Sequence, residues 1–171
     1  AAMAYNRLLD RDVDALNPRT QQRELPQGQV SIRSVRLLWL GASALFLLFS
    51  EALGRHCLVL APFVLALLCF YSWTKRFTAF SHLVLGLSLA CAPGGVWYAL
   101  TGRLAWLPVV LMLAVLCWVS GFDILYSCQD ESFDQRTGLF SVPARYGNEL
   151  AFLIAQALHV VCIGWLMLFG V

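Results

Sequence analysis

Long runs of apolar residues dominate the hydropathy pattern of this chain, and the polar residues collect in the segments between them. Five runs reach the length of a membrane-spanning helix, which is about 17–25 residues. They are Leu37–Leu53, Cys57–Trp73, Leu83–Leu100, Leu104–Phe122 and Leu150–Val171. Because the runs are continuous and do not alternate with a period of two, the pattern predicts helices and not the strands of a membrane barrel.

A short apolar stub, AAMAY, opens the chain and leads directly into a charged stretch. The stub is too short to cross a bilayer. We therefore expect it to be the end of a helix whose start lies outside this sequence. The expected fold class is all-α: a multi-span transmembrane helix bundle with about five full spans plus the end of another, and residues 1–171 forming one partial membrane domain.

The composition agrees with this interpretation. Hydrophobic residues make up 60% of the chain and charged residues 13%, whereas globular domains average about 45–50% and about 25%. The formal net charge is only +2, so no nucleic-acid partner is expected. Five of the six cysteines lie inside apolar runs and none forms a CxxC pair, which favours buried thiols over disulfides or metal ligands.

Charged side chains are distributed unevenly between the two sides of the predicted membrane. Ten of the twelve Lys and Arg residues lie on one set of connections, and only Arg55 and Arg103 lie on the other. The positive-inside rule places the basic side in the cytoplasm. Nine of the ten acidic residues, all except Glu51, lie on that same side. Because aspartate and glutamate contribute little to orientation, the acidic excess needs another explanation.

Two acidic clusters supply that explanation. Asn6, Asp10 and Asp14 are spaced four residues apart, which places them on one face of a helix, with Asp12 on the opposite side. A second set repeats the arrangement beyond the fourth run, and its members are Asp123, Tyr126 or Ser127, Asp130 and Asp134. Stacked carboxylates repel one another by a few tenths of a kcal/mol per exposed pair. Carboxylates that are clustered despite this repulsion therefore indicate a bound cation.

Hard oxygen ligands favour Mg²⁺, which typically takes one or two carboxylates and completes its shell with water and phosphate oxygens. We therefore expect the two clusters to face each other and to hold ions that bridge a diphosphate. Basic side chains would bind the remaining phosphate oxygens. The candidates are Arg19, Arg23, Lys75, Arg76, Arg136 and Arg145.

Three motifs now identify a resemblance. NRLLDRDVD reads as NxxxDxxxD, YSWTK as YxxxK, and DILYSCQDESFD as DxxYxxxDxxxD. In this order and membrane context they resemble the UbiA superfamily of intramembrane aromatic prenyltransferases. The longer strings KRFTAFSHLVLG and GFDILYSCQDESFDQRTGLFSVPARYG are most similar to its 4-hydroxybenzoate polyprenyltransferase branch. The resemblance covers essentially the whole chain.

The resemblance implies nine transmembrane helices around a central cavity, of which this chain would hold the end of the second through the seventh. It implies a first metal–diphosphate site at Asn6, Asp10 and Asp14 and a second at Asp130 and Asp134. Tyr71 and Lys75 would line the pocket and contact the diphosphate. Asp123 and Tyr126 would lie deeper, with Asp123 either stabilising an allylic cation or accepting a proton, or belonging to the metal-site network.

The implied activity is the Mg²⁺-dependent transfer of a polyprenyl group from polyprenyl diphosphate to an aromatic acid, most favourably 4-hydroxybenzoate, in ubiquinone-type quinone biosynthesis. The implied location is a bacterial inner membrane, with the active site facing the cytoplasm. Sister enzymes acting on dihydroxynaphthoate, haem or a glyceryl phosphate stay open as alternatives, as does a non-catalytic membrane fragment. A cation channel or transporter is disfavoured, because its acidic residues would lie near mid-span.

Two histidines receive structural interpretations. His82 lies at the start of the third run and is expected to be a hydrogen-bonded residue at a helix start. His159 lies in the middle of the fifth run. A polar side chain at that depth usually pairs with another helix, so we expect it to serve in packing.

Overall fold

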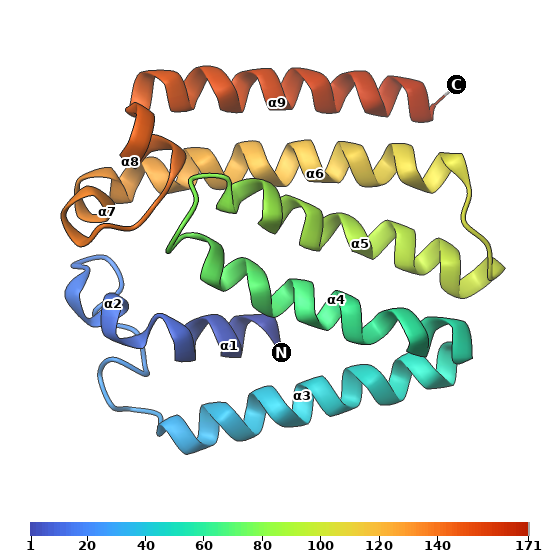
Figure 1. Ribbon diagram of the computed structural model, residues 1–171, viewed down its shortest axis with the longest axis horizontal. Helices are drawn as coiled ribbons and strands as arrows, with labels where there is room; N and C mark the ends of the chain where they lie inside the picture. The colour runs from blue at the N-terminus through green and yellow to red at the C-terminus, as the bar shows by residue number, and fades with distance from the viewer. Residues whose placement is uncertain (171) are drawn as a thin grey trace. The chain divides into compact units, whose positions relative to one another are not determined.

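The computed structural model describes residues 1–170, so Val171, the last residue of the fifth predicted run, lies outside the described residues. Within that range the regular structure is entirely helical, as Figure 1 shows, and the all-α prediction is confirmed. The chain divides into two compact units, one covering Ala1–Trp73 and the other beginning at Thr74.

Five long helices correspond to the five predicted runs. They are α3 (Ile32–Leu53), α4 (Arg55–Thr74), α5 (Ser81–Thr101), α6 (Trp106–Ser127) and α9 (Asn148–Phe169). All five are long and apolar enough to cross a membrane, and the chain is an integral membrane protein. Several helices extend past the apolar runs into polar residues. At the start of α3, for example, the Ser31 hydroxyl caps the helix by accepting a hydrogen bond from the Ser34 N–H at 3.1 Å.

The first unit is organised around its opening helix. The stub is helical, forming α1 (Ala2–Leu9), which packs along α3. Tyr5 lies at the centre of this packing: its ring centroid is 5.4 Å from that of Trp39 on α3, and its hydroxyl accepts a hydrogen bond from the Trp73 indole N–H at 2.6 Å. Tyr5 therefore joins α1 to both long helices of the unit.

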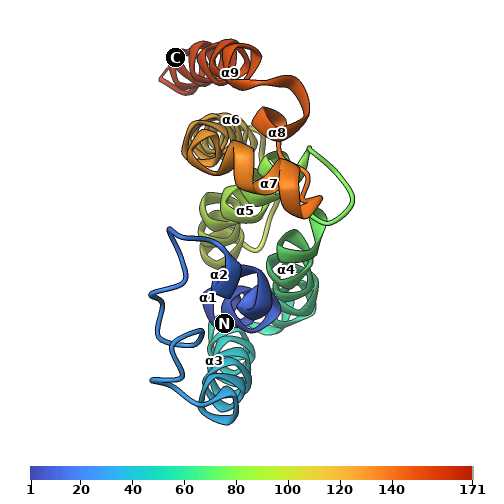
Figure 2. The ribbon, with the colours of Figure 1, turned by 90° about the vertical axis from the view of Figure 1, so that its left-hand side faces the viewer.

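The second unit is a layer of three long helices in which α6 packs between α5 and α9. Figure 2 shows these helices nearly end-on, with the short helices α7 (Glu131–Thr137) and α8 (Val142–Tyr146) in front of them. Small residues allow close contact along the α6–α9 seam, where Ala151 and Ala155 are fully buried against Ile124. In lipid, such close packing takes the place of a hydrophobic driving force between helices.

Glycines bring the helices of this unit close together. A Cβ atom on Gly86 of α5 would meet the Ser120 hydroxyl and the backbone oxygen of Leu116, both on α6. Gly121 of α6 lies against His159 of α9 in the same way. The His159 ring also packs on Trp118, with centroids 5.1 Å apart. The predicted packing role of His159 is therefore confirmed.

We expect Gly86→Ala to lower the free energy of unfolding by about 1–3 kcal/mol, the usual cost of overpacking. The reason is that the new Cβ would lie 2.6 Å from the Leu116 carbonyl oxygen, a backbone atom that cannot move by itself. Thermal denaturation of the detergent-solubilised protein measures the effect. Gly95→Ala is the matched control in the same helix, since its Cβ would meet nothing within 4 Å. Equal melting temperatures for the two variants would contradict the packing argument.

Candidate active site

The first acidic motif lies at the junction of α1 and a short helix, α2 (Arg11–Leu16). Asp10 separates the two helices, yet the backbone hydrogen bonds continue through it. The Asp10 N–H donates to the Asn6 carbonyl, and the Asp14 N–H donates to the Asp10 carbonyl at 2.7 Å. The predicted spacing of four residues is thus kept. The Asn6 amide nitrogen also donates to the Asp10 carboxylate at 3.2 Å, and Asp10 is only 2% exposed.

Asp14 is held by the segment that follows α2. The Arg23 guanidinium pairs with the Asp14 carboxylate at 2.8 Å, and the Thr20 hydroxyl donates to the Asp14 backbone carbonyl at 3.1 Å. Asn17 ends α2 and accepts the Arg19 N–H on its side-chain oxygen at 2.9 Å. The connection therefore folds back and places one predicted diphosphate ligand, Arg23, directly against the first motif. Asp12, by contrast, is solvent-exposed and pairs with Arg11, as its opposite position predicts.

The YxxxK motif lies at the end of α4. Tyr71 belongs to its last turn, and the neighbouring Ser72 is buried and accepts a hydrogen bond from the Asn6 amide nitrogen at 3.4 Å. In the first unit, this contact joins the end of α4 to the first acidic motif. Lys75 follows in the second unit, where its backbone carbonyl accepts the Phe140 N–H at 2.7 Å. Lys75 thus lies beside the segment that follows α7.

The second acidic motif differs from the expected continuous helical ladder. The helix α6 ends at Ser127, a single 3-10 turn covers Cys128–Asp130, and α7 begins at Glu131. We expected Asp123 and Asp134 to lie on one face of a continuous helix. That expectation is wrong, because the backbone between them is not a continuous α-helix. A 3-10 turn has three residues per turn and not 3.6, so it rotates the residues after it relative to those on α6.

The two motifs share one local feature that the sequence pattern did not predict. Asp10 has φ −92° and ψ 4°, and Asp130 has φ −105° and ψ 5°. Both values lie in the bridge region, where many active-site residues are found. In each motif the middle aspartate separates two helical segments, so that the members before and after it belong to different helices: Asn6 and Asp14 in the first motif, Asp123 and Asp134 in the second.

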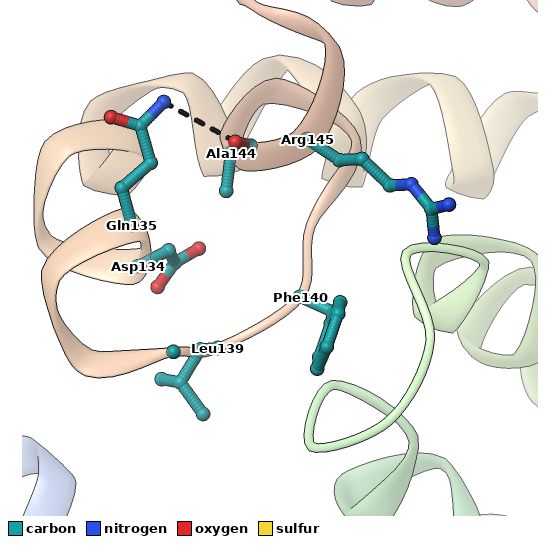
Figure 3. A pocket seen from close by; sticks show the side chains of 7 residues that line it. Asp134, Gln135, Leu139, Phe140, Ala144 and Arg145 are labelled. Atoms are coloured by element: carbon teal, nitrogen blue, oxygen red, sulfur yellow. Dashed lines mark hydrogen bonds between the residues drawn. The ribbon is translucent and has the colours of Figure 1, made fainter.

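Asp134 lies on α7 at the wall of a cavity of about 290 Å³. Its carboxylate accepts a hydrogen bond from the buried Ser141 hydroxyl at 2.9 Å. Figure 3 shows Phe140 and Leu139 on the loop that closes one side, and Gln135 donating to the Ala144 carbonyl at 3.2 Å on the other. This cavity lies within the second unit and brings one acidic ligand candidate next to an open space.

Two of the remaining basic candidates, Arg136 and Arg145, contact a backbone carbonyl and an aromatic ring of the second unit. Arg136 donates from Nε to the Ser132 carbonyl at 3.1 Å, within α7. Arg145 lines the cavity, but Figure 3 shows its side chain pointing away from Asp134, and its guanidinium lies 5.5 Å from the centre of the Tyr146 ring. Arg76 is half-buried just after α4. Their binding of diphosphate stays a prediction.

Asp123 has a partner that the sequence analysis missed. Its Oδ2 atom lies 2.7 Å from Nδ1 of His82, which lies in the first turn of α5 and is 4% exposed. His82 was expected to be hydrogen-bonded, and it is. Its partner could not be foreseen, because the two residues are 41 positions apart and no local motif links them. Tyr126, one turn further along α6, is 46% exposed.

The residues fit Mg²⁺ by the chemistry of their donors. Among residues 1–170, no three His, Cys, Asp or Glu side chains gather into a group that could hold a metal ion by themselves. Mg²⁺ does not need such a group, since it usually takes one or two carboxylates and fills its shell with water and phosphate oxygens. The first motif offers Asn6, Asp10 and Asp14, and the second offers Asp130 and Asp134. That the two motifs face each other stays a prediction, because they belong to different units.

Several known proteins are similar to this chain. A 4-hydroxybenzoate octaprenyltransferase from Yersinia pseudotuberculosis is 29% identical over 99% of the chain and 61% of its own length. The enzyme of the same name from Vibrio vulnificus is 31% identical over 97% of the chain and 59% of its own length. The chain therefore spans about three fifths of these curated relatives.

A solved structure supports the same relationship. The apo structure of a UbiA homolog from Aeropyrum pernix K1 matches 99% of this chain and 66% of its own with a TM-score of 0.91 and 35% sequence identity. The model of the UbiA prenyltransferase family matches residues 1–171. With its two acidic motifs and its layers of apolar helices, the chain belongs to the UbiA prenyltransferase family.

Proposed function

We propose that this chain is part of a Mg²⁺-dependent prenyltransferase that moves a polyprenyl group from polyprenyl diphosphate to an aromatic acid, with 4-hydroxybenzoate as the favoured acceptor. The observation that carries the proposal is the pair of acidic motifs, each built around a bridge-region aspartate, in a UbiA family member. The names of its relatives, both 4-hydroxybenzoate octaprenyltransferases, support the choice of acceptor.

The reaction breaks the allylic C–O bond of the diphosphate and forms a C–C bond to the aromatic ring, which then loses a proton. Negative charge grows on the departing diphosphate, and Mg²⁺ bound by Asn6, Asp10, Asp14, Asp130 and Asp134 would stabilise that charge. Arg19, Arg23, Lys75 and Arg76 would neutralise the phosphate oxygens that remain. The apolar helices exclude water, so that the allylic cation survives until it meets the ring.

Residues deeper than the diphosphate would act on the organic part of the substrates. Tyr71 and Tyr126 would line the pocket. Asp123 lies one to two turns before Asp130 along the chain, and it would stabilise the cation or accept the ring proton. The long isoprenoid tail would lie among the apolar helices, where lipid is the natural solvent. The basic excess on one side favours a bacterial inner membrane with this site facing the cytoplasm.

The pair formed by Arg23 and Asp14 gives this proposal a specific feature. A buried carboxylate next to other carboxylates is unfavourable unless its charge is compensated. Arg23 supplies that compensation and, in doing so, stands beside the proposed diphosphate site. One guanidinium can therefore serve both the motif and the substrate.

We expect Asp10→Ala and Asp130→Ala each to lower turnover by about 100-fold or more, since each removes a charge aimed at the leaving group. The assay follows transfer from polyprenyl diphosphate to labelled 4-hydroxybenzoate in membranes containing the chain, expressed from its complete reading frame. Asp12→Ala is the matched control, because Asp12 lies in the same segment but is exposed and pairs with Arg11. Normal turnover in both Asp10→Ala and Asp130→Ala would contradict the proposed role of the two acidic motifs in prenyl transfer.

Removal of divalent metal should abolish turnover, and added Mg²⁺ should restore it, because the carboxylates would otherwise repel the diphosphate. The measurement is the same transfer assay with a chelator and then with Mg²⁺ in excess. Offering labelled dihydroxynaphthoate in parallel identifies the acceptor. Transfer to that acid and not to 4-hydroxybenzoate would correct the substrate, whereas full turnover in the chelator would exclude the metal.

Arg23→Gln is expected to raise the KM for polyprenyl diphosphate by about 10-fold, as a lost hydrogen bond to a charged group costs about 1.5–3 kcal/mol. Steady-state kinetics with varied diphosphate at saturating acceptor measure the change. Arg33→Gln serves as the control, since Arg33 is exposed at the start of α3. A KM that is the same in both variants would remove Arg23 from the diphosphate site.

A further inference from the structure

His82 connects three elements of the second unit. It is the second residue of α5, and its ring is buried. Nδ1 lies 2.7 Å from the Asp123 carboxylate on α6, and Nε2 lies 3.2 Å from the backbone nitrogen of Val142, the first residue of α8. Its backbone carbonyl accepts a hydrogen bond from the Ser120 hydroxyl at 3.2 Å. Both the ring and the backbone of His82 are therefore held in place.

The contact with Val142 assigns the tautomer of the histidine ring. A backbone N–H can only donate, so Nε2 must be the acceptor and carries no proton. The proton of the singly protonated ring is then on Nδ1, where it is donated to Oδ2 of Asp123. Hydrogen bonds from N–H groups to a carboxylate are among the stronger ones in proteins.

The same contacts reach the second acidic motif. Val142 follows Ser141, whose hydroxyl caps α8 by accepting the Ala144 N–H and also donates to Asp134 at 2.9 Å. A chain of adjacent contacts thus runs from Asp123 through His82, Val142 and Ser141 to Asp134. The two carboxylates lie on α6 and α7, which the 3-10 turn separates. The contacts through His82 and Ser141 provide a second connection between those helices.

We propose that His82 is a positioning residue of the prenyl-transfer site: its Nδ1–H fixes one oxygen of Asp123, so that the other oxygen is presented to the reacting substrate. This inference rests on the proposed function. It explains why a histidine is buried at a helix start and not replaced by an apolar residue. The Asp123 side chain is 32% exposed, so its second oxygen is not enclosed by the histidine.

Two substitutions separate the two ring contacts. In His82→Asn the amide nitrogen takes the place of Nδ1 and keeps the donor to Asp123, but the acceptor for Val142 is lost. In His82→Gln the longer side chain keeps an acceptor near Nε2 and loses the donor to Asp123. The first variant leaves a buried backbone N–H without its acceptor, which is unfavourable, so it should have the lower melting temperature of the two.

We expect kcat to fall about 10-fold or more in His82→Gln, in line with the loss of a partner that orients a functional group, while the KM for polyprenyl diphosphate stays unchanged. His82→Asn should recover most of kcat despite its lower melting temperature. If His82 served only stability, kcat would follow the melting temperature and the order of the variants would be reversed. If the wild type forms product and the two variants have equal kcat values, the role of His82 is overturned while the proposed function stands.

A second measurement does not depend on activity. The chain has only three histidines, so nitrogen NMR of histidine-labelled protein can be assigned by comparison with His82→Gln. The expected signal is a ring protonated at Nδ1 and bare at Nε2. A ring protonated at Nε2 would overturn the inference. Absence of product from the wild-type chain under all assay conditions, with the expected tautomer present, would instead overturn the proposed function and with it the role of His82.

Discussion

Electrostatic compensation of carboxylates at the ends of apolar helices is the constraint on which the candidate site depends. Burying Asp10 and Asp14 next to each other is unfavourable unless each finds a partner. The first unit supplies one through the Asn6 amide and another through the Arg23 guanidinium. The second unit supplies hydrogen bonds from His82 and Ser141. Each partner comes from a different local structure, and each holds the acidic side chain of its own unit in place.

The interruption of the helices has a physical consequence for both motifs. A continuous helix would line up successive carboxylates in one row, with only the slow rotation that its 3.6-residue period imposes. Asp10 and Asp130 instead lie at junctions, so the residues on either side are carried by separate helices whose directions can differ. The seven-residue α7 and the six-residue α2 are too short to be stable by themselves. Their order depends on contacts such as those of Thr20 with Asp14 and Ser141 with Asp134.

Close packing of the long helices makes the contacts of Asp123 available. Gly86 and Ser120 let α5 approach α6, and the approach brings the start of α5 beside the end of α6. A larger residue at position 86 would separate the two helices at the level of Leu116, less than two turns from Asp123. The membrane-spanning layer therefore does more than anchor the chain, because its spacing determines whether His82 reaches a carboxylate. Gly121 and Ala155 play the corresponding part between α6 and α9.

The sequence by itself determined the five spanning helices and the family, because continuous apolar runs and fixed motif spacing are local properties that survive in any arrangement of the helices. It also determined the four-residue spacing of Asn6, Asp10 and Asp14, since hydrogen bonds along the backbone set that geometry. Only the tertiary structure decided that Asp130 ends a 3-10 turn, that Arg23 pairs with Asp14, and that His82 meets Asp123 across 41 residues. The contacts of Arg23 and His82 join separate segments of the chain, and the contact of His82 also depends on how closely α5 and α6 pack, which no hydropathy pattern encodes.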